Sequence, residues 1–341
     1  MEIHWLRVGN SALSKSGYGL GYSIPSGSVR ILFTDNSVDP SAYTSGTDKW
    51  TRVSQTPNVW EYTDSGVFMY GELHWGLGLA DFWWNRERVE WYLLKARVDI
   101  ECTLQDCVGG RLLGITGECD FSGVKNADYL FSGQTYLDTI SGTLDFSSAT
   151  RAVRMFSGTK INEPPKLVMP SLQTAREMFA NCTYMTSVPS SLTFDFPSLL
   201  DASGLFVGCT GLVSAEAHFN FPLCTNAADM YEGCRVLEYI PENIYMPNCI
   251  SIRGMFHNCF ELKSISETFR PASVENCSNA FEDCFKVGSG ALSLYQFLSS
   301  KPVAVEPTSH RDVFWRCGRD STTGHAELEQ IPGSWGGLAP N

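Results

Sequence analysis

Cysteine is the residue type whose number and spacing could carry chemistry in this chain. The 341 residues include 12 cysteines, enough for a disulfide framework or a thiolate zinc site. Six of these cysteines follow an aromatic residue by three positions, in the pairs Phe179/Cys182, Phe206/Cys209, Tyr231/Cys234, Phe256/Cys259, Phe281/Cys284 and Phe314/Cys317. A cysteine that returns once per unit occupies the same layer of every unit. The pattern therefore predicts a structural ladder of buried, reduced thiols that act as small hydrophobic side chains.

The other candidate ligands and nucleophiles form no recognisable constellation. Cys102 and Cys107 are separated by four residues, which is outside the usual zinc pairing, and no second pair follows nearby. The six histidines are scattered, and the sequence holds no H-E-x-x-H, G-x-S-x-G or Walker motif. We therefore expect no metal and no cofactor, and we predict a protein that is not an enzyme.

The aromatic–cysteine spacing belongs to a repeat of about 25 residues. One short, one long and one much longer final step interrupt an otherwise even series of aromatic positions, which are Phe131, Phe156, Phe179, Phe206, Tyr231, Phe256, Phe281 and Phe314. Apolar residues follow the aromatic by six and by nine positions, and Leu112–Phe121 aligns with Leu137–Phe146. Such a unit cannot bury its apolar face alone, so the period predicts a solenoid of stacked units with a parallel sheet, starting near residue 104.

Two steps of the repeat are irregular. Lys160–Lys166 has lost two residues, which predicts a local irregularity in the stack. An insertion at Gly288–Pro302 contains Ala291–Ser300, which is predicted to be helical after a Gly-Ser-Gly break. We expect residues 288–341 to hold this helix, a last repeat at Val313–Cys317 and a C-terminal cap over the open end of the solenoid.

The repeat resembles the BspA-type leucine-rich repeats, which carry an F-x-x-C-x-x-L-x-x-I signature. The resemblance covers roughly residues 104–285, and it implies a curved leucine-rich-repeat solenoid over 104–287. It places a strand at each L-x-x-I segment, such as Leu237–Ile240 and Leu262–Ile265. Outward positions on these strands become candidate binding residues, namely Asp138, Thr139, Thr186, Ser187, Glu238, Tyr239, Lys263 and Ser264.

The first 100 residues have a different composition. Seven of the nine tryptophans lie before residue 92, whereas all cysteines lie after residue 101. The runs Val29–Phe33 and Asn58–Tyr62 predict strands of a small β-rich domain over residues 1–100, with a sandwich as one form. Its tryptophan-rich stretch could be core, a seam or an exposed docking and oligomerisation patch formed by Trp75, Trp83, Trp84 and Trp91. The predicted fold class is thus mainly β with short helical or irregular segments.

Charge and hydropathy restrict the partners. The net charge of −12 argues against nucleic acid and against an anionic membrane as partners. The sequence has no apolar run of 18 residues, which argues against membrane insertion, and no secretory signal pattern is recognisable at its start. A solenoid presents a long regular surface, which suits recognition of a protein or glycan.

The resemblance is compatible with two biological settings, a bacterial cell surface and a bacteriophage particle, and a third role is kept as a further alternative. BspA-type repeats are typical of bacterial cell-surface adhesins, which normally carry a signal peptide. Such repeats behind a small β-domain also look like proteins encoded by bacteriophages of gut bacteria. We predict a virion component, a head or tail fibre or decoration protein, assembled in the reducing bacterial cytoplasm, where unpaired thiols persist. Its expected partners are other virion proteins, further copies of itself and a host cell-surface glycan or protein. The alternatives are a bacterial surface adhesin and an intracellular protein-binding scaffold.

Overall fold

The computed structural model describes residues 27–33, 36–37, 39, 50–64, 71–72, 89–97, 102–103, 110–300 and 307–340. They belong to two compact units, unit 1 (Met1–Arg151 and Pro165–Met169) and unit 2 (Ala152–Pro164 and Pro170–Asn341). The predicted class is confirmed, because the chain is mainly β with few helices and a parallel β-solenoid. Within the described ranges, none of the helices has the length and apolar character that a bilayer crossing requires.

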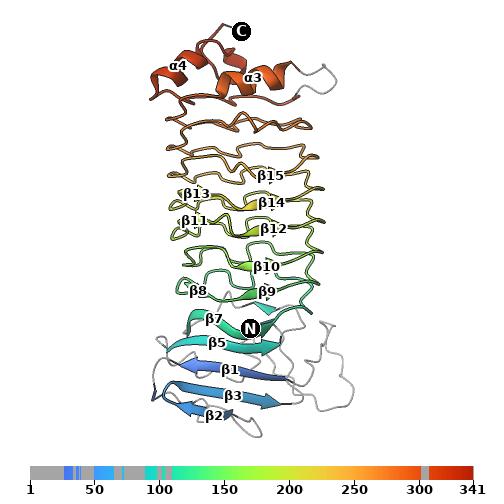
Figure 1. Cartoon of the computed structure of the whole chain (residues 1–341), viewed down its shortest axis with the longest axis vertical. Helices are drawn as coiled ribbons and strands as arrows, with labels where there is room; N and C mark the ends of the chain where they lie inside the picture. Colours follow the sequence, from blue (N-terminus) through green and yellow to red (C-terminus); the bar gives the residue numbers. More distant parts are fainter. Residues whose placement is uncertain are drawn as a thin grey trace, which may run out of the picture. The chain divides into compact units, whose positions relative to one another are not determined.

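Unit 1 is built on a six-stranded mixed sheet with the strand order β2-β3-β1-β5-β7-β8. Its inner pairings change from antiparallel (β2–β3, β3–β1, β1–β5) to parallel (β5–β7, β7–β8) at β5. The strands of unit 1 are β1 (Gly27–Phe33), β2 (Trp50–Gln55), β3 (Asn58–Asp64), β4 (Gly71–Glu72), β5 (Val89–Arg97), β6 (Cys102–Thr103), β7 (Gly110–Asp120), β8 (Thr139–Ile140), β9 (Thr143–Asp145) and β10 (Lys166–Val168). Figure 1 shows β1, β3 and β2, coloured blue, on the side of β5 that faces away from β7.

The two predicted strands near the start of the chain are present as β1 and β3. The side chains of Ile31, Phe33, Val59, Trp60 and Leu93 are buried. The described strands do not form a sandwich. Apart from the short β4–β6 pair, those before residue 100 join a single sheet, because β5 pairs with β7 and so continues the sheet into the first repeat.

The repeat register is visible in unit 1. β7 pairs with β8 through Gly114 opposite Thr139 and Ile115 opposite Ile140, so the paired residues are one full repeat apart, as in the alignment of the two sequence segments. β9 pairs with β10 through Lys166 opposite Thr143, which is slightly less than one repeat. The predicted irregularity at Lys160–Lys166 therefore shortens one turn without breaking this pairing.

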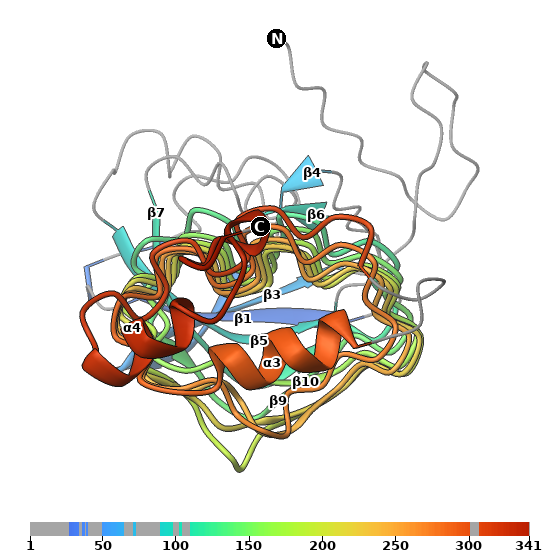
Figure 2. The same ribbon diagram turned by 90° about the horizontal axis from the view of Figure 1, so that it is seen from above.

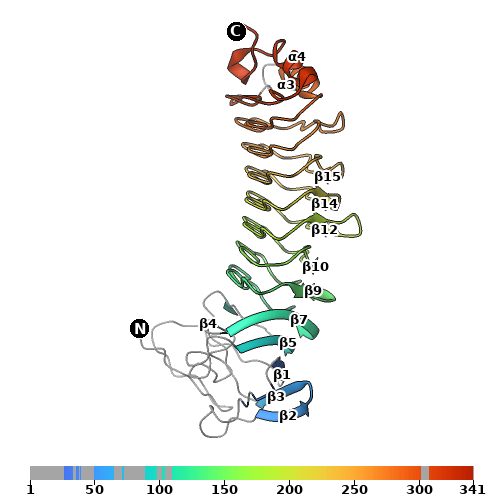
Figure 3. The ribbon, with the colours of Figure 1, turned by 90° about the vertical axis from the view of Figure 1, so that its left-hand side faces the viewer.

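Unit 2 is a stack of flat turns, each joined to the next by parallel pairing (Figure 1, Figure 3). Seen along the stack, the turns superpose on one another (Figure 2). Its elements are the strands β11 (Ser187–Val188), β12 (Thr193–Asp195), β13 (Ser214–Ala215), β14 (His218–Asn220) and β15 (Ile244–Tyr245), the helices α3 (Ala291–Ser299) and α4 (Thr322–Leu328), and the 3₁₀ helix η2 (Gly333–Trp335).

Each turn contacts its neighbours along three lines, although the sequence predicted one strand per unit. β11 pairs with β13 on the first line, and β12, β14 and β15 pair on the second. The expected strands at Leu237–Ile240 and Leu262–Ile265 reduce to a single bridge between Tyr239 and Ser264. The turns bend too often for longer strands. The third line consists of single-residue bridges through Thr174, Asp201, Asn226, Ser251, Asn276 and Ser309.

Two residues with left-handed backbone flank every aromatic residue of the repeat, two positions before it and two after it. Gly204 and Gly208 flank Phe206 with φ of 61° and 72°, and Asp229 and Gly233 flank Tyr231 with φ of 58° and 72°. Glycine, asparagine and aspartate adopt this conformation most readily. This explains why glycine or asparagine so often precedes the cysteine of the repeat.

The aromatic residues form a continuous column inside unit 2. Successive rings are stacked with centroids 5.2–5.5 Å apart and interplanar angles between 2° and 19°. The ring spacing is close to the distance between paired strands, so each ring packs on its equivalent in the next turn. The column comprises Phe156, Phe179, Phe206, Tyr231, Phe256 and Phe281.

The insertion predicted to be helical is confirmed as α3. Gly290, with φ of 98°, precedes α3, and the side chain of Ser321 accepts a hydrogen bond from the Gly324 amide at the start of α4. Phe314 donates its backbone N–H to the Trp335 carbonyl, and the buried Trp335 ring stacks on His310 with 4.2 Å between centroids. The segment from α4 to η2 thus packs on the last aromatic turn, where a cap was expected.

Candidate recognition surface

The six cysteines of the repeat point into unit 2. Each has no exposed surface, and all six are free thiols. Five of them donate a hydrogen bond from Sγ to the backbone carbonyl of the preceding turn's aromatic residue, at 3.1–3.3 Å. These donors are Cys182, Cys209, Cys234, Cys259 and Cys284.

Burial makes most of the interior thiols poor nucleophiles, whereas the hydrogen bond with Cys209 lowers the pKa of Cys182. Burial raises the pKa of Cys234 and of Cys317, and it raises the pKa of Cys224 to about 11 and that of Cys249 to about 12. The thiolate, not the thiol, is the reactive and metal-binding form. These residues therefore support the fold rather than chemistry.

Six of the eight predicted binding residues lie together on unit 2. Backbone hydrogen bonds run from Thr186 to Asn162, from Val213 to Thr186, from Glu238 to Val213 and from Lys263 to Glu238. The neighbouring positions pair likewise, Ser187 with Ser214 and Tyr239 with Ser264. We call this surface, together with the adjoining Lys160 and Tyr184, the strand face, which comprises Lys160, Asn162, Glu163, Tyr184, Thr186, Ser187, Val213, Ser214, Glu238, Tyr239, Lys263 and Ser264.

The other two predicted binding residues belong to unit 1. Asp138 and Thr139 are exposed at β8, where the Thr139 hydroxyl donates to the Asp138 carboxylate at 2.8 Å. They are neighbours of each other. The structure therefore groups the predicted residues into a pair on unit 1 and a set of six on unit 2.

Polar contacts between successive turns organise the strand face. Thr186 donates to the Asn162 side-chain oxygen at 2.8 Å, and Ser187 donates to a Glu163 carboxylate oxygen at 3.1 Å. Lys263 Nζ lies 2.5 Å from Glu238 Oε2 and 5.1 Å from the centre of the Tyr239 ring. The hydrogen bond to Glu238 is the main cause that raises the pKa of Lys263.

Two exposed tyrosines flank this network. Tyr239 is 54% exposed, and Tyr184 is 60% exposed, with Lys160 Nζ 5.5 Å from its ring centre. Sequence reasoning missed Tyr184 and Lys160. Tyr184 lies five residues after its aromatic, at a position occupied by Gly211 and Glu261 in other turns. An exposed aromatic side chain at a position of varied composition is the signal that could have identified it.

The tryptophans proposed for docking are mostly beyond what the structure describes. Trp75, Trp83 and Trp84 lie outside the described residues. Trp91 belongs to β5, with its backbone opposite Phe33 of β1 and Leu112 of β7. The docking role of these four residues stays a prediction.

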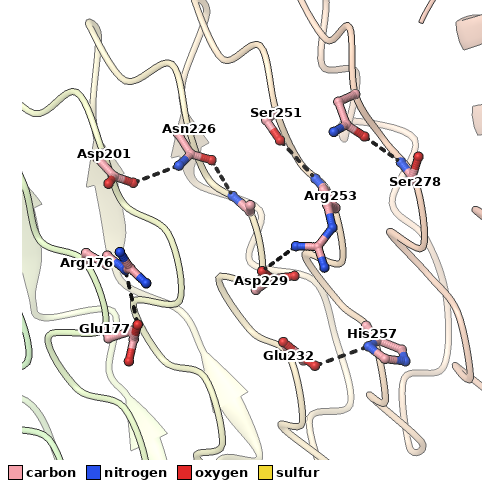
Figure 4. A network of polar contacts seen from close by, with 12 residues as sticks. Arg176, Glu177, Asp201, Asn226, Asp229, Glu232, Ser251, Arg253, His257 and Ser278 are labelled. Carbon is pink, nitrogen blue, oxygen red and sulfur yellow. Dashed lines mark hydrogen bonds and ion pairs between the residues drawn. The ribbon is translucent and has the colours of Figure 1, made fainter. Parts of the chain in front are cut away.

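A row of turn-capping side chains follows the third line of unit 2 (Figure 4). Asp201, Asn226 and Asn276 each accept a hydrogen bond from the backbone amide two residues later, at 3.0–3.1 Å, and Ser251 does so at 3.4 Å. Asn226 also donates its side-chain amide to Asp201 at 3.0 Å. These residues stabilise the bends of successive turns, and they leave the strand face as the candidate for recognition.

A charged cluster on the same turns has the donor types of a cation site. His257, Glu282 and Asp283 place one ligand atom each within 4.8 Å of one another. However, Arg316 contacts both carboxylate oxygens of Asp283 at 2.6 Å and neutralises this group. We therefore treat the cluster as an ion-pair network.

Parallel turns with stacked aromatic rings and buried cysteines define a β-solenoid protein with BspA-like repeats. The family described as "Mycoplasma protein of unknown function, DUF285" matches residues 114–210 and 173–293. Together the two matches run from 114 to 293, which is more than half of the chain. The chain belongs to this family. No curated protein and no solved structure matches it.

Proposed function

We propose that this protein is a non-enzymatic recognition protein that binds a host-surface molecule through its strand face. The observation that carries the proposal is the contrast between rows of unit 2. Interior rows repeat phenylalanine, cysteine and leucine, whereas one row of the strand face changes its side chain in every turn, through Asn162, Thr186, Val213, Glu238 and Lys263. A constant frame with a varied outer row is the arrangement by which solenoid proteins present binding surfaces.

The chemistry of the strand face favours contact over catalysis. It offers tyrosine rings, hydroxyl groups, an amide and ion-paired charges. Exposed tyrosines supply large contact area at low entropic cost, and their hydroxyls keep a polar end for hydrogen bonding. A glycan or a protein surface is the class of partner that uses such groups.

We place this activity on a bacteriophage virion, as part of a head or tail fibre or as a decoration protein. Free thiols throughout the repeat and a net charge of −12 favour assembly in a reducing cytoplasm without nucleic acid as the partner. The alternative is a bacterial cell-surface adhesin. The coarser role of a surface or binding repeat protein fits the DUF285 family in both settings.

The experiment measures binding of the purified chain to intact candidate host cells, detected through a terminal tag. The variant Tyr184→Ala with Tyr239→Ala removes both exposed rings of the surface. We expect binding to weaken at least tenfold. Tyr245→Ala is the matched control, because Tyr245 is 57% exposed but lies on β15, on another line of the stack. Equal binding by all three proteins, or an equal loss in both variants, would overturn the proposal.

The setting is tested separately by mass spectrometry of purified phage particles. Detection of the chain at a stoichiometric copy number is the expected result. Its absence from particles and presence on washed bacterial cells would favour the adhesin.

A further inference from the structure

One histidine connects three successive turns of unit 2. Glu232, His257 and Glu282 occupy the same position of successive repeats and directly follow the aromatic residue of their turns. His257 Nδ1 lies 3.3 Å from Glu232 Oε1, as Figure 4 shows, and His257 Nε2 lies 3.8 Å from Glu282 Oε2. Each nitrogen of one imidazole therefore faces a carboxylate of a different neighbouring turn.

The protonation state of this ring decides whether both contacts are favourable. A neutral imidazole has one N–H donor and one lone pair, so it can donate to one carboxylate while its lone pair faces the other. An imidazolium has two N–H donors and a positive charge. Only the charged form attracts Glu232 and Glu282 at the same time.

Two arginines of these turns are paired with aspartates, so His257 is the group that can supply a positive charge between Glu232 and Glu282. Arg253 pairs with Asp229 at 3.0 Å, and Arg316 pairs with Asp283 at 2.6 Å. Within the described residues, the ion pairs of Glu232 and Glu282 are those with His257. Asn279 donates a hydrogen bond to Glu282 Oε2 at 2.5 Å, which holds that carboxylate in place.

We propose that His257 is a proton-operated clamp that tightens the stack between the turns of Glu232 and Glu282 when it is protonated. The clamp is a property of the solenoid itself and does not rest on the proposed binding function. It would raise the stability of these turns of unit 2 at mildly acidic pH.

The direction of the effect follows from linkage. The hydrogen bond to Glu232 is the largest influence on the pKa of His257, and with the charges of Glu282, Glu232 and Asp283 it raises that pKa above the ordinary 6.5 despite the opposing effect of burial. A group whose pKa is raised by folding stabilises the folded state fully below its unfolded pKa. That stabilisation is lost as the pH rises through the folded-state pKa.

The test compares thermal unfolding of the wild type, His257→Gln and His218→Gln between pH 5.5 and 8.5. His218 is the control, because it lies exposed on β14. We expect the wild type to melt about 2–4 °C above His257→Gln below pH 6.5, with this gap closing at the alkaline end. The gap between the wild type and His257→Gln should change with pH more than the gap between the wild type and His218→Gln. A constant gap for His257→Gln would overturn the proposal.

A second measurement covers the case in which His257→Gln does not fold. The titration of the His257 ring protons is followed by NMR in the wild type and in Glu282→Gln. We expect a midpoint above the ordinary histidine value in the wild type and a lower one in the variant. A wild-type midpoint at or below the ordinary value, or no change in Glu282→Gln, would contradict the clamp.

Discussion

The interior of unit 2 and its strand face follow different rules, although the same turns build both. In the interior, each side chain packs on its equivalent in the next turn. The position of Phe206 therefore requires an aromatic ring above and below, and that of Cys234 requires a small side chain that reaches a carbonyl. On the strand face, Thr186, Val213, Glu238 and Lys263 succeed one another at one position. Stacking constrains the side chains inside unit 2, whereas the residues of the strand face are free of this constraint.

The largest effect is expected where the stacking column is interrupted. Phe206 is fully buried between Phe179 and Tyr231, with ring centroids 5.5 and 5.4 Å away. Phe206→Ala removes both contacts and leaves a cavity, which should lower the free energy of unfolding by about 3–5 kcal/mol. Urea denaturation measures this. A loss below about 1 kcal/mol would mean that the column does not hold the turns together.

A smaller loss is expected when one thiol of the ladder becomes a hydroxyl. Cys234 is fully buried and donates to the Phe206 carbonyl at 3.3 Å. Cys234→Ser places a more polar and smaller group in the same layer, which should cost about 1–3 kcal/mol of unfolding free energy. A melting temperature equal to that of the wild type would contradict the buried ladder.

One substitution inside unit 2 should stabilise the protein, because it gives the aromatic column another phenylalanine. Tyr231 occupies the aromatic column, and in the described residues its buried hydroxyl has no hydrogen-bond partner. Tyr231→Phe removes an unsatisfied polar group and keeps the ring stacking, so we expect a gain of about 1–2 kcal/mol in denaturation experiments. If the variant is less stable than the wild type, the hydroxyl has a role that the packing does not show.

The smallest effect is expected on the strand face. Lys263 pairs with Glu238 in a solvent-exposed contact, and such pairs contribute little to stability. Lys263→Ala should leave the melting temperature within about 1 °C of the wild type. A decrease in melting temperature as large as that of Cys234→Ser would contradict the distinction between an interior that stabilises the fold and a variable face.

The interior was predictable from sequence because it repeats. The spacing of aromatic and cysteine residues predicted the period, and the insertion in its last step predicted the helix α3. Only one strand per unit was predicted, so the second and third lines of contacts were missed, and on the third line Thr174, Asp201, Asn226 and Ser251 differ in type. Their shared property is a short polar side chain, and for Asp201, Asn226 and Ser251 the structure shows it capping the bend.

The strand face was predictable only in part. Thr186, Ser187, Glu238, Tyr239, Lys263 and Ser264 followed from the expected strand positions, and they lie together. Tyr184 and Lys160 were missed because a short step and then a long step of the repeat shift the register just there. Lys160 lies four positions after its aromatic and Tyr184 five, so only the fold shows that they are neighbours.

The central claim, a closed interior that supports a variable face, is tested most directly by thiol labelling of the native protein, with the modified residues located by mass spectrometry. Both burial and raised pKa values protect most of the interior thiols. We predict that Cys182, Cys209, Cys234, Cys259, Cys284 and Cys317 stay unmodified at pH 8 until the protein is unfolded, and then all react. Rapid modification of these six residues in the folded protein would contradict the account.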